Sequence, residues 1–295
     1  MITVTPTVKA AWVSVLSNTT LVIAKVIVGI TIGSVSVISE AIHSGNDLLA
    51  SIIALFAVKT SSKPPDERHN YGHGKVENIS GTIEALLIFI AAIMIIKEAV
   101  EKLMGSGELL TVNWGIGVMG LSACLNLAVS AYLMKIARQE HSIALEADAM
   151  HLRTDVYTSF GVMAGLVLIK ITGLAILDPL VAMMVALLIV KAAYELTRKA
   201  FVPLMDTSLS SEEVTALKVV MEKCIEEYED IEYHDLRTRR SGKECHIDFH
   251  LVANPHRSIA EIHRLCDQLE EQIGSEFPHS YVMVHVEPNG LIQQD

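Results

Sequence analysis

Six long apolar segments dominate the first two thirds of the chain. Each is close to the roughly 20 residues that a helix needs to cross the hydrocarbon core of a bilayer. The segments lie at approximately residues 10–32, 35–58, 79–102, 113–135, 146–170 and 177–198. This pattern predicts an α-helical membrane domain with six transmembrane helices, over residues 1–206.

After residue 206 the pattern becomes that of a small α+β domain, over residues 207–295. Helices are expected at Ser208 to Asp230 and at Ser258 to Ile273, where a serine precedes acidic residues as an N-cap. Strands are expected at residues 231–240, 244–252 and 281–287, with a Ser241-Gly242 turn after the first. The predicted order is therefore αββαβ.

Two of these strands alternate between apolar and polar positions, so one face is expected to pack while the other presents ligands. In the second strand the polar positions are His246, Asp248 and His250. In the last strand His285 and Glu287 share a face. The candidate metal ligands of this domain are His234, His250, His263, His285 and Glu287. Taken alone, each histidine is more often a plain surface residue.

Composition agrees with a membrane protein. Apolar residues make up 51% of the 295 residues and charged residues 19%, with a mean hydropathy of +0.41, whereas soluble domains are about 25% charged. These values exclude a disordered chain, a basic nucleic-acid-binding protein and an ordinary soluble enzyme. The four cysteines include no C-x-x-C pair, which argues against a disulfide scaffold or a thiolate zinc ribbon.

The net charge of −11 is concentrated in the C-terminal part. Residues 1–206 hold 16 acids and 15 bases, whereas residues 207–295 hold 18 acids, 8 bases and 7 of the 12 histidines. An acidic domain attracts cations and repels nucleic acid. A merely solvated acidic surface is the alternative interpretation.

Lysine and arginine are distributed unequally between the two sides of the predicted bundle. On one side lie Lys9, Lys59, Lys63, Arg68, Lys75, Lys135, Arg138, Arg198 and Lys199. On the other side lie Lys97, Lys102 and Lys170. By the positive-inside rule, both termini and the C-terminal domain are expected in the cytoplasm.

Two of the apolar segments carry the same polar motif, H-x-x-x-D. The second segment has His43 and Asp47, and the fifth has His151 and Asp155. Spacing of four residues puts both side chains on one face of a helix. Two such faces in contact would offer two imidazoles and two carboxylates, a set that suits Zn²⁺ or another borderline divalent metal better than Mg²⁺ or Ca²⁺.

A single H-x-x-x-D is more simply explained as a hydrogen bond on one helix. The occurrence of two copies at membrane depth, where an ionisable side chain is costly, favours a binding site. Imidazole must lose its proton to bind a metal, so metal and protons would compete for this site. Such competition is the chemistry of an antiporter.

The segment between the second and third apolar segments is rich in proline and glycine and is therefore predicted to be a loop. Asp66, His69 and His73 are spaced within it so that they could bind a metal. A polar turn with charged anchors is the alternative, of nearly equal weight. Lys75 could pair with Asp206, which closes the last apolar segment.

The chain resembles the cation diffusion facilitator family over nearly its whole length. The resemblance is carried by GSVSVISEAIHSGNDLLAS, PDERHNYGHGKVEN, the second H-x-x-x-D, PLMD and HDLRTRRSG. It implies a homodimeric zinc/proton antiporter that exports metal from the cytoplasm, with a metallochaperone-like cytoplasmic domain and no enzymatic activity. For a bacterium the membrane would be the inner cell membrane.

The resemblance also implies roles for the candidate residues. It assigns His43, Asp47, His151 and Asp155 to transport, Asp66, His69 and His73 to a loop site, and Lys75 with Asp206 to a charge interlock. It assigns the five C-terminal candidates to a binuclear site that stabilises the dimer. His43 stands where zinc-selective members have His and where the zinc/iron branch has Asp, which favours zinc; Glu287 stands where that branch has Asp.

Other functions are compatible with parts of the same pattern. A membrane zinc hydrolase is disfavoured because no H-E-x-x-H motif is present and because four protein ligands leave no open position. A metal sensor or scaffold that moves no ions remains open. So does a transporter of the same type that carries Fe²⁺, Mn²⁺, Co²⁺ or Cd²⁺.

Overall fold

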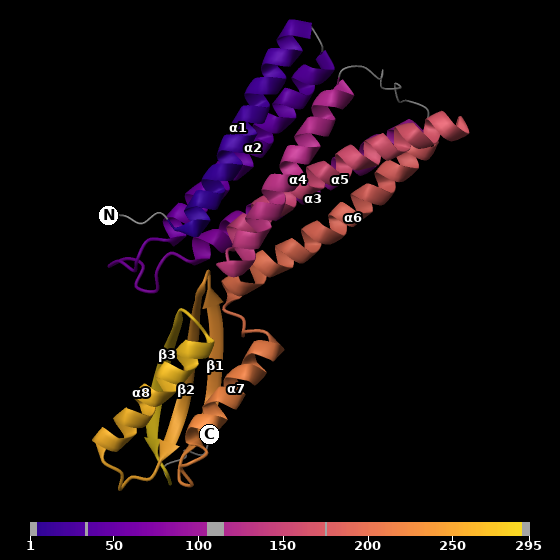
Figure 1. The fold of residues 1–295 in the computed structure, drawn as a ribbon. Helices are drawn as coiled ribbons and strands as arrows, with labels where there is room; N and C mark the ends of the chain where they lie inside the picture. The colour runs from indigo at the N-terminus through magenta and orange to yellow at the C-terminus, as the bar shows by residue number, and fades with distance from the viewer. Residues whose placement is uncertain (1–4, 33–34, 105–114, 175, 291–295) are drawn as a thin grey trace. The chain divides into compact units, whose positions relative to one another are not determined.

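A computed structural model describes residues 5–32, 35–104, 115–174 and 176–290 of the chain. The chain forms two compact units, Met1–Phe201 and Val202–Asp295. Figure 1 shows long helices in the first unit and a small sheet with two helices in the second.

Within the described residues, the first unit contains six long helices. They are α1 (Pro6–Ile32), α2 (Val35–Ser61), α3 (Lys75–Leu103), α4 (Gly115–Gln139), α5 (Ile143–Thr172) and α6 (Leu177–Phe201). Each coincides with one predicted apolar segment to within a few residues, and the predicted residues 113–114 lie outside the described ranges. The apolar runs therefore located every helix of this unit.

Five of the described helices, α1, α2, α3, α4 and α6, are long and apolar enough to cross a membrane. The sequence predicted six crossings, and α5 is not among the five. Its first half carries Glu146, Asp148, Arg153 and Asp155, which lower its hydropathy. A crossing by α5, which packs against α3, α4 and α6, stays a prediction.

The interior of the helical unit is built largely from alanine. One buried cluster joins α1, α2, α4 and α5 through residues such as Ala11, Ala57, Ala137 and Ala149. A second joins α3, α5 and α6 through residues that include Ala85, Ala147 and Ala193. Small side chains let helix backbones approach closely, which is how helices associate where lipid supplies no hydrophobic drive. The α5 helix belongs to both clusters and so holds the bundle together.

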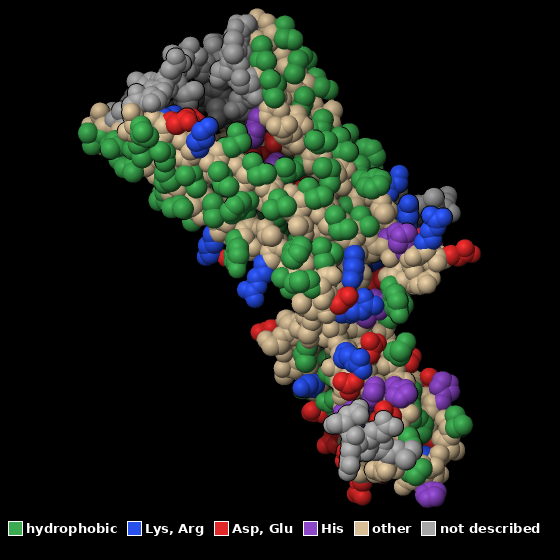
Figure 2. Space-filling view, turned by 180° about the vertical axis from the view of Figure 1, so that it is seen from behind, with side chains coloured by type: hydrophobic (Ala, Val, Ile, Leu, Met, Phe, Trp, Pro, Cys, Tyr) green, Lys and Arg blue, Asp and Glu red, His purple; other side chains and the backbone are tan. Residues whose placement is uncertain are grey.

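Large apolar side chains cover the outside of the same helices. Leu16, Ile30, Phe56, Leu121 and Ile171 are each more than 60% exposed. Figure 2 shows this surface as a nearly continuous hydrophobic layer. A soluble protein rarely exposes so large an apolar area, so this surface is suited to contact lipid.

The second unit has the predicted αββαβ order, after a short 3-10 helix η1 (Val202–Met205). Its elements are α7 (Ser211–Ile225), β1 (Glu232–Ser241), β2 (Glu244–Ala253), α8 (Ile259–Glu276) and β3 (Ser280–Pro288). The strand order is β1-β2-β3, with β1 antiparallel and β3 parallel to the central β2. The turn after β1 contains Gly242 with a φ of +59°, a conformation that favours glycine.

Both helices of this domain cover one face of the sheet. The predicted apolar positions of β2, Ile247, Phe249 and Leu251, are fully buried in a core with Leu217 of α7 and Leu269 of α8. Because side chains alternate across a strand, the residues between them point away from this core. The opposite face of the sheet is thereby left for the histidines.

The α7 helix is shorter than predicted. It begins after the N-cap Ser210, which makes a reciprocal capping box with Glu213, and it ends at Ile225 rather than Asp230. The residues that follow, Glu226 to Asp230, are mostly acidic. Negative charge at a helix C-terminus opposes the helix dipole, which accounts for the early end.

The α8 helix depends on a similar cap, formed by Ser258 and Glu261. We expect Ser258→Ala to destabilise this helix by about 1 kcal/mol, because it removes the side-chain acceptor of the Glu261 backbone N–H and with it half of the capping box. Hydrogen exchange of the first turn of α8, measured in the full-length protein, should then accelerate about fivefold. Ser275→Ala, at the exposed far end of α8, is the matched control and should leave exchange there unchanged. Equal protection in the Ser258 variant and the native chain would show that the cap contributes nothing.

Candidate functional site

The two H-x-x-x-D motifs lie on facing turns of α2 and α5, and their side chains pair across the two helices. His151 Nε2 lies 3.2 Å from Asp47 Oδ1, and His43 Nε2 lies 3.6 Å from Asp155 Oδ1. Each histidine thus forms an ion pair with the aspartate of the other helix. The alternative of two isolated single-helix pairs does not describe this geometry.

The spacing of these atoms suits a tetrahedral metal ion. Adjacent ligands of zinc, at bonds of about 2.0–2.2 Å, lie roughly 3.3–3.6 Å apart. Ligand atoms of His43, Asp47 and Asp155 all lie within 4.8 Å of one another, and His151 adjoins Asp47. Three of the four residues are therefore close enough together to share one ion, and His151 contacts this group through Asp47.

The group of four is buried unequally. The side chains of Asp47, His151 and Asp155 are 6%, 12% and 18% exposed, whereas that of His43 is 54% exposed. Figure 2 shows histidine and acidic side chains within a recess of the hydrophobic helical surface. The arrangement has a closed side and an open side, and His43 marks the open one.

Hydrogen bonds from neighbouring helices hold the two motifs in place. Asn18 of α1 donates to the backbone oxygen of Asp47 at 3.4 Å. On α5, Arg153 Nε donates to Ser130 Oγ of α4 at 3.0 Å, and Ser130 donates in turn to the backbone oxygen of Ala149 at 2.8 Å. These bonds fix the rotation of α5, and hence the direction in which His151 and Asp155 point.

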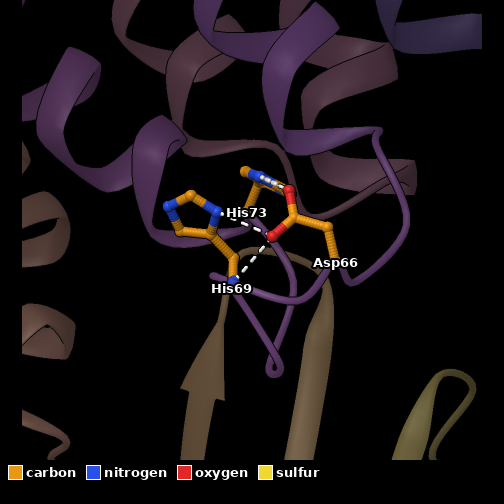
Figure 3. Close-up of side chains that lie close together, drawn as sticks. All are labelled: Asp66, His69 and His73. Atoms are coloured by element: carbon orange, nitrogen blue, oxygen red, sulfur yellow. Dashed lines mark hydrogen bonds and ion pairs between the residues drawn. The ribbon is translucent and has the colours of Figure 1, made fainter.

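The loop between α2 and α3 brings its three candidate residues together, as Figure 3 shows. Asp66 Oδ1 lies 3.0 Å from His69 Nδ1, and Asp66 Oδ2 lies 3.3 Å from His73 Nε2. One carboxylate thus contacts two imidazoles, the geometry of a small three-ligand site. Asp66 and His69 are about half exposed, and His73 is largely buried.

Backbone N–H groups donate hydrogen bonds to the Asp66 carboxylate and stabilise its ionised form. The N–H groups of His69 and Arg68 donate to its Oδ1 at 2.7 and 2.9 Å. These hydrogen bonds, that of His69 first, hold the pKa of Asp66 below its usual value of 3.8. The carboxylate is therefore kept ionised, the form that a metal ligand requires.

Strand register aligns three histidines of the C-terminal domain. His234 of β1 pairs with His250 of β2, and His250 pairs with His285 of β3. Glu287 Oε2 lies 3.2 Å from His234 Nε2, while its Oε1 lies 3.0 Å from His250 Nδ1 and 3.6 Å from His285 Nε2. A single carboxylate therefore bridges three imidazoles on the open face of the sheet.

His263 is not part of this group. It lies on α8, where its Nδ1 is 3.6 Å from Asp267, and its side chain is 74% exposed. Asp235, which was not predicted, adjoins the group instead, with its Oδ2 3.8 Å from His250 Nε2. A β-bulge between His234 and Arg237 turns Asp235 out of the regular alternation, so periodicity alone could not have found it.

Asp206 has a partner within its own domain. Its carboxylate accepts a hydrogen bond from Arg239 Nη1 of β1 at 3.2 Å. Lys75, the residue predicted to pair with it, opens α3 in the other unit. The charge interlock between Lys75 and Asp206 stays a prediction.

Sequence reasoning missed four ionisable residues that the described helices bury. Glu84 and Asp148 are fully buried, whereas Lys25 is 5% and Glu77 is 7% exposed. Lys25 Nζ donates to Ser44 Oγ at 2.8 Å, beside His43. The sequence did mark these residues, because any ionisable residue inside an apolar segment is a candidate functional residue. Each of these residues occurs singly, outside any repeated motif.

The two parts of the chain match two family models. Residues 11–205 match the cation efflux transmembrane domain, and residues 210–289 match the cytoplasmic domain of cation efflux proteins. The first match alone covers more than half of the chain. This chain belongs to the cation diffusion facilitator family.

Relatives within the cation diffusion facilitator family align over most of their length. An uncharacterized transporter of Synechocystis is 35% identical over 258 residues, covering 87% of this chain and 82% of the relative. The cation-efflux pump FieF of Shewanella oneidensis is 28% identical over 279 residues, covering 95% and 93%. An uncharacterized transporter of Methanocaldococcus jannaschii is 30% identical over 280 residues, covering 95% and 97%.

Membership of the cation diffusion facilitator family establishes the type of protein and the general class of its substrate. The protein is a multi-pass membrane transporter for the efflux of divalent metal cations, and it is not an enzyme. The metalloenzyme alternative is thereby excluded. The particular metal, the coupling ion and the roles of individual residues are matters for proposal.

The loop geometry predicts how Asp66 titrates. We expect its carboxyl to titrate below pH 3.8 in the metal-free protein, because the folded loop stabilises the ionised form. This stabilisation is complete above the usual pKa and is lost as pH falls through the lowered one. The side-chain carboxyl carbon-13 shift of Asp66, followed against pH in the full-length protein, measures the midpoint. A midpoint at or above 3.8 would contradict the proposed role of the backbone donors.

Proposed function

We propose that this protein is a zinc/proton antiporter that exports Zn²⁺ from the cytoplasm, with His43, Asp47, His151 and Asp155 as the transport site. One observation carries the proposal. Two imidazoles and two carboxylates pair crosswise between α2 and α5, at 3.2 and 3.6 Å, inside a helical unit with a lipid-compatible surface. Ionisable groups in such a position are retained for function.

The chemistry of the four groups supports zinc as the substrate. Zn²⁺ accepts nitrogen and oxygen ligands in tetrahedral geometry, whereas Mg²⁺ and Ca²⁺ prefer shells made of oxygen alone. Fe²⁺, Mn²⁺, Co²⁺ and Cd²⁺ are alternative substrates that accept a similar set. A panel of these metals in the transport assay described below ranks them.

The exchange of the metal ion for protons follows from the chemistry of the same four side chains. A metal binds only neutral imidazole and ionised carboxylate, so binding displaces protons and protonation displaces the metal. Transport then requires two states of the bundle, one open to each side, that differ in their affinity for metal and proton. In the state open to the cytoplasm Zn²⁺ binds, and in the other state incoming protons release it.

The orientation of the protein in the membrane is proposed from the distribution of lysine and arginine. The excess of lysine and arginine on one side of the helical unit supports cytoplasmic termini, and in a bacterium the membrane would be the inner cell membrane. We further propose that the protein is a homodimer, as the resemblance implies. The C-terminal cluster of His234, His250, His285 and Glu287 would then bind cytoplasmic zinc and adjust activity, outside the transport path.

The transport site is tested by zinc flux into proteoliposomes under an imposed pH gradient. We expect Asp47→Ala to abolish this flux, because it removes one ligand and one negative charge. Loss of a residue that merely orients a ligand already weakens metal binding about 10–100-fold, so loss of a ligand should cost at least as much. Glu195→Ala is the matched control, since this acid of α6 is 65% exposed and pairs only with Lys191 among the described residues.

Each result of the flux assay has a distinct meaning. Gradient-dependent flux in native protein and in Glu195→Ala, with none in Asp47→Ala, supports both the antiport and its site. Native flux in Asp47→Ala would contradict the site. Tight zinc binding without flux in the native protein, for every metal of the panel, would favour the sensor or scaffold alternative.

The C-terminal cluster is tested by His285→Ala. Because this substitution removes an imidazole next to Glu287, we expect the zinc concentration that gives half-maximal flux to rise, while flux at saturating zinc stays near the native value. His279→Ala, in the loop before β3, serves as the control and should change neither. If His285→Ala abolished flux at saturating zinc in a protein that remains dimeric, the cluster would lie on the transport path.

A further inference from the structure

One carboxylate links the ends of the two helices that carry the H-x-x-x-D motifs. Glu77 lies in the first turn of α3 and is buried. Its Oε1 accepts a hydrogen bond at 2.6 Å from Oγ of Ser61, the last residue of α2. Its Oε2 accepts a hydrogen bond from Oγ of Ser142, the residue directly before α5. The end of α2 and the start of α5 are therefore held to each other through a single side chain of α3.

Both serine hydroxyls favour this carboxylate over their other neighbours. Ser61 Oγ also lies 3.1 Å from the backbone oxygen of Val58, but its one proton goes to the nearer and charged acceptor. Ser142 Oγ accepts a longer hydrogen bond, of 3.4 Å, from the backbone N–H of Leu145, which leaves its own proton for Glu77. The two hydrogen bonds of Glu77 are thus charge-assisted, the stronger kind.

Two further contacts bring helices together at the same end of α3. Asn78 Nδ2, which is buried, donates to the backbone oxygen of Ala200 in α6 at 3.1 Å. One turn along α3, a Cβ added to Gly81 would lie 2.7 Å from Ile143 Cγ2 of α5 and 3.3 Å from Ala200 Cβ. The close approach of α3 to the start of α5 therefore depends on the absence of a side chain at position 81.

The four ligands are closed off toward this end of the bundle. Asp47 and Ser61 are 14 residues apart on α2, nearly four helical turns, and so lie on the same face. The residues between them on that face are fully buried, and they are Ser51, Ala54 and Val58. The exposed ligand, His43, lies on the other side of Asp47 along the helix. Figure 1 shows the helices of this unit converging at the end where α2 stops and fanning out toward the other end.

We propose that Glu77 with its donors Ser61 and Ser142, here named the Glu77 clasp, closes the transport site to the cytoplasm and opens once in each transport cycle. This inference rests on the proposed transport site and orientation. Alternating access requires α2 and α5 to part at the cytoplasmic end before a metal can enter there. Glu77 is a positioning residue, because it contacts α2 and α5 rather than the metal and determines from which side the ligands are reached.

A cysteine on the closed path tests the clasp. Ala54→Cys places a thiol on the buried face of α2, seven residues from both Asp47 and Ser61. In inside-out membrane vesicles with a chelator present, a membrane-impermeant maleimide reaches this thiol when the cytoplasmic end opens. Mass spectrometry separates labelling at residue 54 from that of the native cysteines. We expect Glu77→Gln to raise the labelling rate about tenfold, since a hydrogen bond to an ionised group shifts an equilibrium by about this factor or more.

Two further positions test the cause of the opening. Gly81→Ala leaves every hydrogen-bonding group in place, but its Cβ would press on Ile143, so it should part α3 from α5 and also raise the labelling rate. Ser61→Ala, which removes one donor of the clasp, should do the same. Ser61→Thr retains the hydroxyl and should label at nearly the native rate. If Glu77→Gln is not obtained folded, these variants carry the same expectation.

Asp178→Asn is the matched control. Lys102 Nζ lies 3.3 Å from Asp178 Oδ2, so this contact joins the last turn of α3 to α6 without involving α2 or α5. Its removal should leave labelling at residue 54 unchanged. A rise equal to that of Glu77→Gln would show general loosening of the bundle and would overturn the clasp.

Transport separates the clasp from the ligands. Glu77→Gln retains all four ligands, so we expect it to bind zinc, but to reduce flux at saturating zinc because each cycle must close this end again. If Asp47→Ala abolishes flux while Glu77→Gln, Gly81→Ala and Ser61→Ala all label at the native rate, the clasp is overturned and the transport site stands. If Asp47→Ala keeps native flux, the proposed function fails, and the clasp fails with it for want of a site to close.

Discussion

A polar side chain inside a bilayer must find its partner within the protein, because hydrocarbon supplies none. The contact between α2 and α5 follows from this constraint. Each helix carries a histidine and an aspartate one turn apart, and each histidine forms an ion pair with the aspartate of the other helix. Under the proposed function, a metal ion would take the place of these contacts, so the same four side chains would meet one electrostatic requirement in two ways.

The sequence predicted the elements well because their signals are local. Apolar runs located the six helices, and alternation identified the face of β2 that packs. The H-x-x-x-D spacing placed His43 beside Asp47 on one helical face, and the same held for the second motif. The end of α7 was wrong by five residues because the acidic run after Ile225, read as helix, opposes the helix dipole.

Features that depend on how elements pack were not predictable in this way. Nothing in the spacing says that His151 contacts Asp47 and not Asp155, since only the rotation of α5 against α2 decides it. The approach of Asp235 to His250 arises from a β-bulge, whose position periodicity does not reveal.

The alanine-rich interfaces bear on how the bundle can move. Large side chains that interlock make a helix contact hard to shift, because every ridge must leave its groove before it can enter the next. Where α1, α2, α4 and α5 meet, six of the twelve buried residues of the described cluster are alanines, which form neither deep grooves nor high ridges. Such surfaces allow shear and rotation at little steric cost. The same small residues that bring the helices close therefore also let them slide past one another. The polar contacts between α2 and α5 then favour one particular arrangement.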